Sequence, residues 1–146
     1  LPKQTISLPL EVFDHSKVLA WEIEELRNLC WKEAGVDRSE RGLQFAHDII
    51  QKKIEYLKNE SLLNFTMHHE KDICSVFDDS SRININLLLD LNHRLLSSLL
   101  LFKASLFRRE SRGGHFRIDF PSNLPFWRCH SIQVKDKPIS TIPVKV

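Results

Sequence analysis

The sequence predicts an all-α domain, a three-helix bundle of the up-down-up kind seen in spectrin repeats, with an irregular C-terminal tail that has room for a short β-hairpin. Apolar residues recur at helical spacing over 16–34 and again from Asp37 onward. A third segment, from Ile83 to about Ser111, is apolar on more than one face, which is typical of a helix buried between two others. With 146 residues, 42% hydrophobic and 27% charged, the chain can bury one core.

The first helix is predicted to begin at Asp14 or Ser16, either of which can cap it, and to end before Gly35. Its apolar face has the spacing i, i+4, i+7 and i+11. The residues on that face are Leu19, Ile23, Leu26 and Cys30. Gly35 is expected to adopt a positive φ as the residue that follows the helix. Trp21 and Trp31 lie on the same helix and are expected to be core or interface aromatics.

The second helix is predicted to follow at once, because Asp37 with Glu40 three residues later has the form of a capping box. Its apolar stripe consists of Leu43, Ala46, Ile50, Ile54 and Leu57. Over 59–84 the periodicity fails, which predicts a long loop or a weak helix. The His-His-Glu run at 68–70 is interpreted as a solvated loop rather than a metal site, because position 73 is Ile and the H-E-x-x-H pattern fails.

The third helix is predicted from Ile83 to about Ser111 and is expected to lie between the other two. Polar residues interrupt its leucines, which argues against a membrane span. These residues are Asp90, His93, Arg94 and Lys103. Arginines in the last turn are expected to oppose the negative end of the helix dipole, and Gly113 or Gly114 to cap the helix.

Residues 121–146 form the predicted tail. Two β-like runs, Ser131–Lys135 and Ile139–Val146, flank a turn at 136–138. Pro143 has no backbone N–H to donate, so the second run is expected to be an edge strand.

The composition excludes several classes of function. The four glycines fit neither G-x-G-x-x-G nor a P-loop nor G-x-S-x-G, so this chain alone is not expected to bind a dinucleotide. Three widely spaced cysteines give no disulfide framework and favour a reducing compartment, hence a cytoplasmic location. Cys129-His130 is interpreted as a packed cysteine, not as a nucleophile beside its base. The net charge of +2 indicates neither a nucleic-acid nor a membrane partner.

The densest group of charges lies at 107–121, next to a glycine turn. One interpretation is a capped helix end; the other is a set of guanidinium forks that bind carboxylate, phosphate or backbone carbonyl groups. The two interpretations are compatible. A non-catalytic helical module that binds nucleic acid or another anion is therefore an alternative function for the chain. The arginines that would serve it are Arg108, Arg109, Arg112 and Arg117.

Two motifs include this cluster and the turn between the first two helices. The first is Arg109-Glu110-Ser111-Arg112-Gly113-x-His115-x-Arg117-x-Asp119-Phe120-Pro121, followed by Trp127-x-x-His130. The second is Trp31-x-x-Ala34-Gly35-Val36-x-Arg38, followed by Gly42-Leu43. Together they resemble the C-terminal domain of the succinate dehydrogenase/fumarate reductase flavoprotein superfamily. L-aspartate oxidases are the nearer match within it, because residues 122–126 are uncharged where the dehydrogenases carry an acidic run.

The resemblance covers roughly residues 16–135 and implies a domain organisation. Residues 1–15 would be an extended linker from a flavin-binding domain that this chain lacks, 16–120 a helical C-terminal domain and 121–146 the tail. It also implies the activity of the parent enzyme, the FAD-dependent oxidation of L-aspartate to iminoaspartate for NAD biosynthesis via quinolinate. The alternative parent is a succinate dehydrogenase or fumarate reductase flavoprotein.

The resemblance assigns this chain no catalytic, cofactor-binding or metal-binding residue, because the family's glycines and substrate-binding residues precede this region. FAD is expected in the parent enzyme and not in this chain, which alone is expected to be inactive. The implied partners are the flavin-binding and capping domains of the parent, with no nucleic acid and no membrane. The residues given a structural and interdomain role are Arg109, Glu110, Arg112, Gly113, His115, Arg117 and Asp119.

Overall fold

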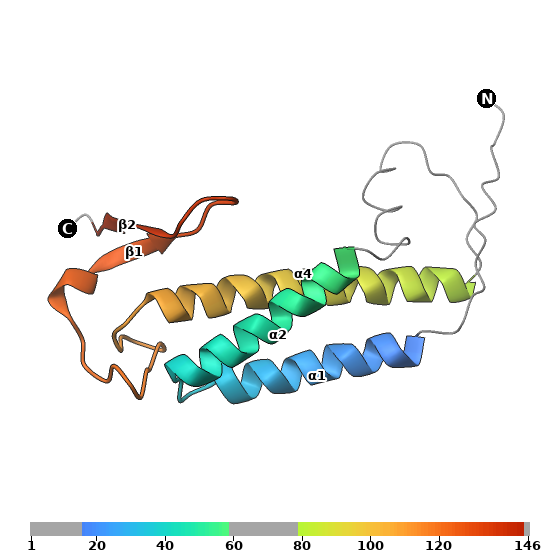
Figure 1. Ribbon diagram of the computed structural model, residues 1–146, viewed down its shortest axis with the longest axis horizontal. Coiled ribbons are helices and arrows are strands. Elements are labelled where there is room, and N and C mark those ends of the chain that lie inside the picture. Colours follow the sequence, from blue (N-terminus) through green and yellow to red (C-terminus); the bar gives the residue numbers. More distant parts are fainter. Residues whose placement is uncertain (1–15, 59–78, 145–146) are drawn as a thin grey trace, which may run out of the picture.

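A computed structural model describes residues 16–58 and 79–144 of the chain. Within them the predicted fold class is confirmed: three helices run up, down and up, and a short antiparallel hairpin follows (Figure 1). The elements are α1 (Ser16–Ala34), α2 (Glu40–Lys58), α4 (Asp79–Phe107), a 3-10 turn (Pro125–Trp127), β1 (Cys129–Ile132) and β2 (Ser140–Pro143). The predicted linker at 1–15 and the His-His-Glu run at 68–70 lie outside the described residues.

The bounds of α1 are those predicted, but its end differs from the expectation. Gly35 does not have a positive φ; among the described residues only Gly113 and Asp136 do. A Cβ at position 35 would lie 2.3 Å from the carbonyl oxygen of Trp31, so glycine is needed there for space. Trp21 and Trp31 are 58% and 79% exposed and are therefore not part of the core of this domain.

The start of α2 is capped by Ser39. The prediction of a capping box formed by Asp37 and Glu40 is therefore wrong. The Ser39 hydroxyl accepts a hydrogen bond from the amide of Gly42 at 3.2 Å, and the Ser39 carbonyl accepts one from the amide of Leu43 at 2.9 Å. Serine is a favoured N-cap because its short side chain reaches the free amides of the first turn.

Helix α4 begins earlier and ends earlier than predicted. It includes 79–84, where the sequence predicts part of a loop or weak helix. The buried Asn84 lies in the row of core residues that continues through Leu88, Leu91 and Leu95. A polar residue in that row hides the helical period from a sequence analysis. The helix ends at Phe107 and not near Ser111, so its last turn contains no basic residue.

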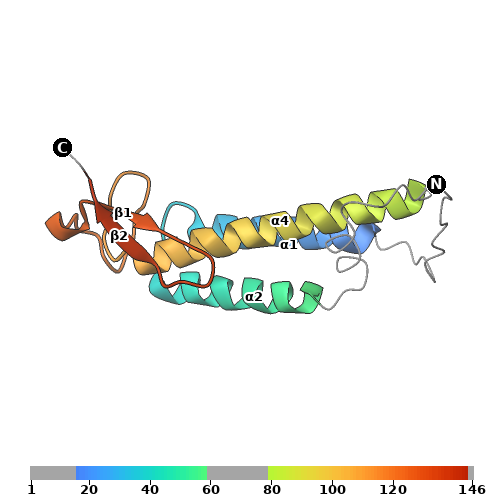
Figure 2. The ribbon, with the colours of Figure 1, turned by 90° about the horizontal axis from the view of Figure 1, so that it is seen from above.

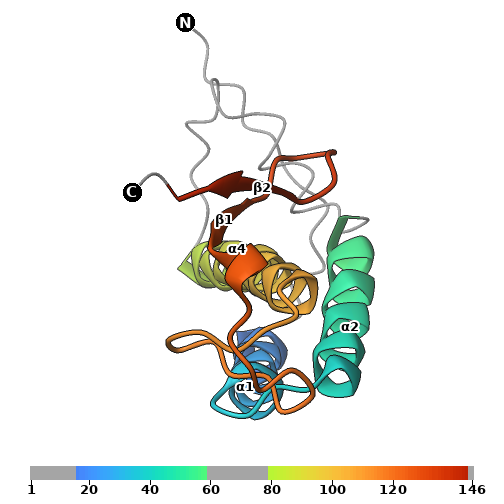
Figure 3. The same cartoon turned by 90° about the vertical axis from the view of Figure 1, so that its left-hand side faces the viewer.

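The core lies where α4 packs against both other helices, as predicted; α1 and α2 contact each other less extensively (Figure 3). The fully buried side chains include Leu43, Ala46, Ile50, Leu95 and Phe102. Lys53 of α2 forms an ion pair with Glu22 of α1 across the bundle.

Segment Arg82–Phe107 has the length and apolar composition of a membrane span, a test that core helices of soluble proteins also pass.

The tail forms the hairpin, shifted from the predicted runs. Strands β1 and β2 pair antiparallel, with Cys129 opposite Pro143 and Ile132 opposite Ser140. The turn between them contains Asp136, whose φ of 58° is positive. The hairpin crosses the C-terminal half of α4 (Figure 2), where the side-chain amide of Gln133 donates to the carbonyl oxygen of Leu100 at 2.9 Å.

Candidate functional site

The charged motif folds into a compact loop at one end of the bundle, beside the turn between α1 and α2. Two backbone hydrogen bonds join the two segments: the amide of Arg38 donates to the carbonyl of Phe116 at 3.3 Å, and the amide of Ile118 to the carbonyl of Arg38 at 2.9 Å. Residues separated by almost 80 positions in the sequence therefore lie side by side. The two motifs of the sequence analysis meet at this point.

Gly113 and Gly114 form a tight turn in this loop and do not cap a helix, contrary to the prediction. The amide of Arg112 donates to the carbonyl of His115 at 2.8 Å, and the amide of His115 donates back at 3.1 Å. Gly113 has φ of 56°, a left-handed conformation that costs other residues energy. The turn brings the side chains on either side of it together.

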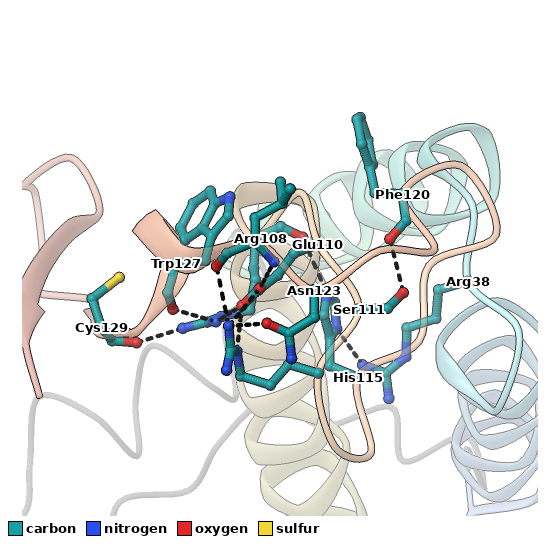
Figure 4. Close-up of polar contacts among 11 residues, drawn as sticks. Arg38, Arg108, Glu110, Ser111, His115, Phe120, Asn123, Trp127 and Cys129 are labelled. Carbon is teal, nitrogen blue, oxygen red and sulfur yellow. Dashed lines mark hydrogen bonds and ion pairs between the residues drawn. The ribbon is translucent and has the colours of Figure 1, made fainter.

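The first group of charges in the loop, the Glu110 cluster, consists of Arg108, Glu110, Arg112 and Asn123 (Figure 4). The Glu110 side chain is fully inaccessible to solvent. Its carboxylate accepts hydrogen bonds from Arg108, from Arg112 (Nε at 2.9 Å and Nη2 at 3.1 Å) and from the amide of Leu124 at 3.0 Å. A buried carboxylate needs this number of donors, since an unpaired charge in the interior is costly.

The protonation state of Glu110 follows from these contacts. Burial is the largest single influence and raises its pKa, but the hydrogen bonds from Arg112, Leu124 and Arg108, with the charge of Arg112, outweigh it and lower the pKa overall. The hydrogen bond to Glu110 in turn raises the pKa of Arg112. The cluster is therefore an ionised carboxylate held between two guanidinium groups at neutral pH.

The same two arginines attach the tail to the end of α4. Arg108 donates to the carbonyl oxygens of Trp127 at 3.1 Å and Cys129 at 2.5 Å, and its guanidinium carbon lies 5.3 Å from the centre of the Trp127 ring. Arg112 donates to Asn123 and, at 3.1 Å, to the carbonyl oxygen of Leu124. These bonds fix where the hairpin leaves the helical bundle.

The second group, the Arg117 cluster, consists of Arg117, Asp119, Glu40 and the backbone of Ser105. The Arg117 side chain is fully buried and forms a two-pronged pair with Asp119, in which both N–O distances are 2.7 Å. Its third contact is to the carbonyl oxygen of Ser105 at 2.8 Å. Hydrogen bonding to Arg117 is the main cause of the low pKa of Asp119, about 2.

Asp119 also contacts the start of α2, which lies 79 positions earlier in the sequence. Its Oδ2 accepts a hydrogen bond from the amide of Glu40 at 2.8 Å, and so it occupies the N-terminus of that helix. A carboxylate is favourable there because the first amides are free and the helix dipole is positive at that end. The Glu40 carboxylate lies 3.8 Å from Arg117 and 3.3 Å from Arg109.

His115 and Arg38 link the two clusters to the end of α1. Arg38 donates to Nδ1 of His115 at 2.9 Å, and Nε2 of the same ring donates to the carbonyl oxygen of Arg108 at 3.0 Å. Burial is the main cause that lowers the pKa of His115; nearby arginines lower it further, against the opposing effect of the Arg108 hydrogen bond. The imidazole is therefore neutral at pH 7. Arg38 also donates to the carbonyl of Ala34, the last residue of α1, and to that of Gly35, which follows it.

The structure places the predicted site residues in one network. Glu110, Arg112, His115, Arg117 and Asp119 bond to groups inside the domain, and Gly113 makes the turn among them. Arg109 is 60% exposed; it bonds to Glu40 at 3.3 Å and lies 5.9 Å from the Phe120 ring. These contacts lie within the domain, and the structural and interdomain role of the seven residues stays a prediction.

Some residues of the network have no role assigned by the sequence analysis. Arg38 and Ser111 stand in the recognised motifs; the Ser111 hydroxyl accepts from the amide of Arg117 and lies 2.8 Å from the carbonyl oxygen of Phe120. The sequence predicts Glu40 only as part of the capping box and predicts no role for Asn123, because the partners of both are set by the meeting of distant segments. Arg108 is one of the predicted anion-binding arginines, but it binds a buried carboxylate and two carbonyls of its own domain.

The described residues do not fit a flavin dinucleotide. A pyrophosphate needs a glycine turn leading into a helix N-terminus, but Gly113 and Gly114 connect two bridged residues, and the N-terminus of α2 already holds the Asp119 carboxylate. Within 16–58 and 79–144 there is no group of three side chains able to ligate a metal ion. Cys129 is half-buried and the adjacent His130 exposed, as neighbours along a strand alternate sides.

The comparisons with known proteins agree with the motifs. The family described as "Fumarate reductase flavoprotein C-term" matches residues 23–146. An L-aspartate oxidase of Nostoc sp. is 30% identical over 139 residues, which is 92% of this chain and 24% of that protein. A fumarate reductase (CoM/CoB) polypeptide of Methanothermobacter marburgensis is 29% identical over 107 residues, 72% of this chain and 17% of that polypeptide.

The chain thus spans about a quarter or less of the length of these relatives. No solved structure matches it significantly. The family match covers most of the chain and includes both charged clusters. Of the described helices and strands, it leaves out only the first turns of α1. This chain therefore belongs to the C-terminal helical domain family of the succinate dehydrogenase/fumarate reductase flavoproteins.

Proposed function

We propose that this chain is the C-terminal helical domain of an FAD-dependent L-aspartate oxidase, a cytoplasmic enzyme that converts L-aspartate to iminoaspartate in NAD biosynthesis via quinolinate. The observation that carries the proposal is the similarity to the Nostoc L-aspartate oxidase along 92% of this chain. A second L-aspartate oxidase, from Synechocystis sp., is 30% identical over 109 residues. The uncharged stretch at 122–126 also favours this branch over the dehydrogenases.

The role of the domain in this enzyme is structural. The charged side chains of the recognised motif pair with groups inside the domain. The clearest examples are the buried Glu110 and Arg117. Substrate binding, proton transfer and the FAD site are assigned to the part of the longer protein that this chain does not include. Hydride transfer needs the flavin as acceptor, so this chain alone turns over no aspartate.

A succinate dehydrogenase or fumarate reductase flavoprotein is the second candidate, favoured by the similarity to the Methanothermobacter fumarate reductase.

A nucleic-acid-binding module has less support. All four of its candidate arginines bind carboxylates or carbonyls of the domain, and Arg109, at 60%, is the most exposed of them. Phosphate-binding arginines have to reach outward from a protein surface.

Two measurements test the proposal. The longer protein is assayed with L-aspartate and with succinate as electron donors; oxidation of aspartate alone supports the L-aspartate oxidase, and oxidation of succinate alone supports the second candidate. The 146-residue chain is incubated with FAD, and flavin fluorescence is titrated against it. We expect no stoichiometric complex, and a tight one would contradict the assignment of the FAD site to the rest of the protein.

A further inference from the structure

A cavity of about 530 Å³ lies among the three helices, toward the end of the bundle opposite the loop that holds the charged motif. The helices α1 and α2 are close at the turn that joins them and diverge away from it, and the cavity lies where they have diverged (Figure 1). Its wall is mostly apolar and includes Leu19, Leu57, Leu88, Leu91 and Leu95. Protein interiors hold few spaces larger than a water molecule, whereas ligand pockets have about 300–1,000 Å³. The cavity therefore has the size of a small-molecule site.

One buried polar group of this wall has no hydrogen-bond partner. The side chain of Asn84 lines the cavity and is only 7% exposed, and its Oδ1 accepts no hydrogen bond. An acceptor left unpaired in a protein interior is unfavourable, and such groups are few in native proteins. A donor placed inside the cavity would satisfy Asn84, which makes this atom the polar contact point of the cavity.

The charged side chains nearest to the cavity do not supply that donor. Lys53 of α2 donates to the carboxylate of Glu22 of α1, and this partly exposed pair forms part of the rim. A buried water molecule needs two to four polar partners, and among the described residues of the wall Oδ1 of Asn84 is the one buried side-chain polar atom without a partner. A larger molecule also gains from leaving water for the apolar wall, so it suits the cavity better than water does.

We infer that this cavity, the interhelical site, binds a small, mainly apolar molecule that donates one hydrogen bond from an N–H or O–H group to Oδ1 of Asn84. The apolar body of the molecule supplies the driving force, and the donor fixes its orientation. The donor group is neutral, because a buried ammonium group would need more than one acceptor to replace its water. The inference goes beyond the structural role proposed for the domain and does not depend on the substrate of the longer protein.

The test titrates the 146-residue chain with indole and with benzofuran in a calorimeter. Indole is an apolar bicyclic molecule with one N–H donor, and benzofuran has nearly the same shape with an oxygen in place of the N–H. We expect a stoichiometric complex with indole, bound about tenfold more tightly than benzofuran, because only indole can donate to Asn84.

Three variants locate the site. Asn84→Leu removes the acceptor at similar volume, so the chain should stay folded and bind indole no more tightly than benzofuran. Asn86→Leu is the matched control, because Asn86 is exposed on the same helix, and it should keep the tenfold difference. Leu91→Phe extends a side chain of the wall into the cavity and should weaken the binding of both molecules. Circular dichroism checks that each variant is folded.

Loss of the preference for indole in Asn84→Leu, with Asn86→Leu unchanged, supports the interhelical site. The inference is wrong if the unchanged chain binds indole and benzofuran equally, if it binds neither at millimolar concentration, or if Asn84→Leu keeps the preference. A longer protein that binds no indole shows that its other residues fill the cavity, and this result also overturns the inference. The assay of the longer protein with aspartate and succinate tests the proposed function separately, so either can fail alone.

Discussion

The helical core and the loop at the end of the bundle are stabilised in different ways. In the core, the fully buried side chains are apolar and come from rows at helical spacing, such as Leu43, Ile50 and Leu95. In the end loop, the fully buried side chains are Glu110 and Arg117, and each is held by partners from several segments. The core therefore depends on volume and apolarity, and the loop on the geometry of particular donors and acceptors.

The two regions should respond differently to conservative changes. Cores accept swaps of similar volume at a cost usually below about 1.5 kcal/mol. A two-pronged arginine–carboxylate pair has no such tolerance, because lysine offers a point charge where arginine offers a planar fork. We therefore expect position 117 to tolerate fewer replacements than a core position such as Leu95.

The largest expected effect is in the core. Leu95→Ala should lower the free energy of unfolding by about 2–5 kcal/mol, because Leu95 is completely buried and the surroundings fill the cavity only in part. Leu96→Ala is the control, since Leu96 is 42% exposed on the same helix. Urea unfolding followed by circular dichroism measures both. A loss below about 0.5 kcal/mol for Leu95→Ala would place this leucine outside the core.

The Glu110 cluster should show the next effect. Glu110→Gln should destabilise the chain by about 2–3 kcal/mol, because it removes the charged acceptor of two arginines and turns an amide N–H toward them. Glu24→Gln is the matched control, because Glu24 forms an exposed pair with Arg27 that contributes little. Equal midpoints for the two variants in urea would show that the Glu110 cluster contributes no stability.

The sequence predicts the core better than the end loop. The rows of α1 and α2 follow from the spacing of apolar residues, and only the polar Asn84 hid the start of α4. The loop depends on pairs such as Arg38 with His115 and Glu40 with Asp119, which are joined across more than 75 positions. No local pattern encodes such pairs, so motif similarity identified the residues without giving their partners.

His115 should make the end loop sensitive to mild acid. Its pKa is lowered from 6.5 in the folded chain, so as the pH falls below about 6.5 the unfolded chain binds a proton that the folded chain does not. Stability should therefore fall as the pH drops below about 6.5. His115→Gln, which keeps a donor and an acceptor, should reduce this dependence, whereas His93→Gln on the exposed side of α4 should not. An unchanged pH profile for His115→Gln would contradict the account.

The smallest effect is expected at the glycine turn. Gly113→Ala should cost about 1 kcal/mol, because its φ of 56° is unfavourable for a residue with a side chain. Gly114→Ala should be nearly neutral, since its φ is ordinary and a Cβ there meets nothing within 4 Å. Thermal unfolding of the two variants distinguishes them, and equal melting temperatures would mean that the turn differs from the one described.

Arg117 offers the most direct test of the claim that the motif charges act inside the domain. The experiment is urea unfolding of the 146-residue chain by itself with Arg117→Lys, compared with Leu95→Met in the core. We predict a loss of about 2 kcal/mol for Arg117→Lys, which breaks the two-pronged pair with Asp119, and a smaller loss for Leu95→Met. If Arg117→Lys left the isolated chain as stable as the unchanged one, the arginine would serve a contact outside this domain, and the account would be wrong.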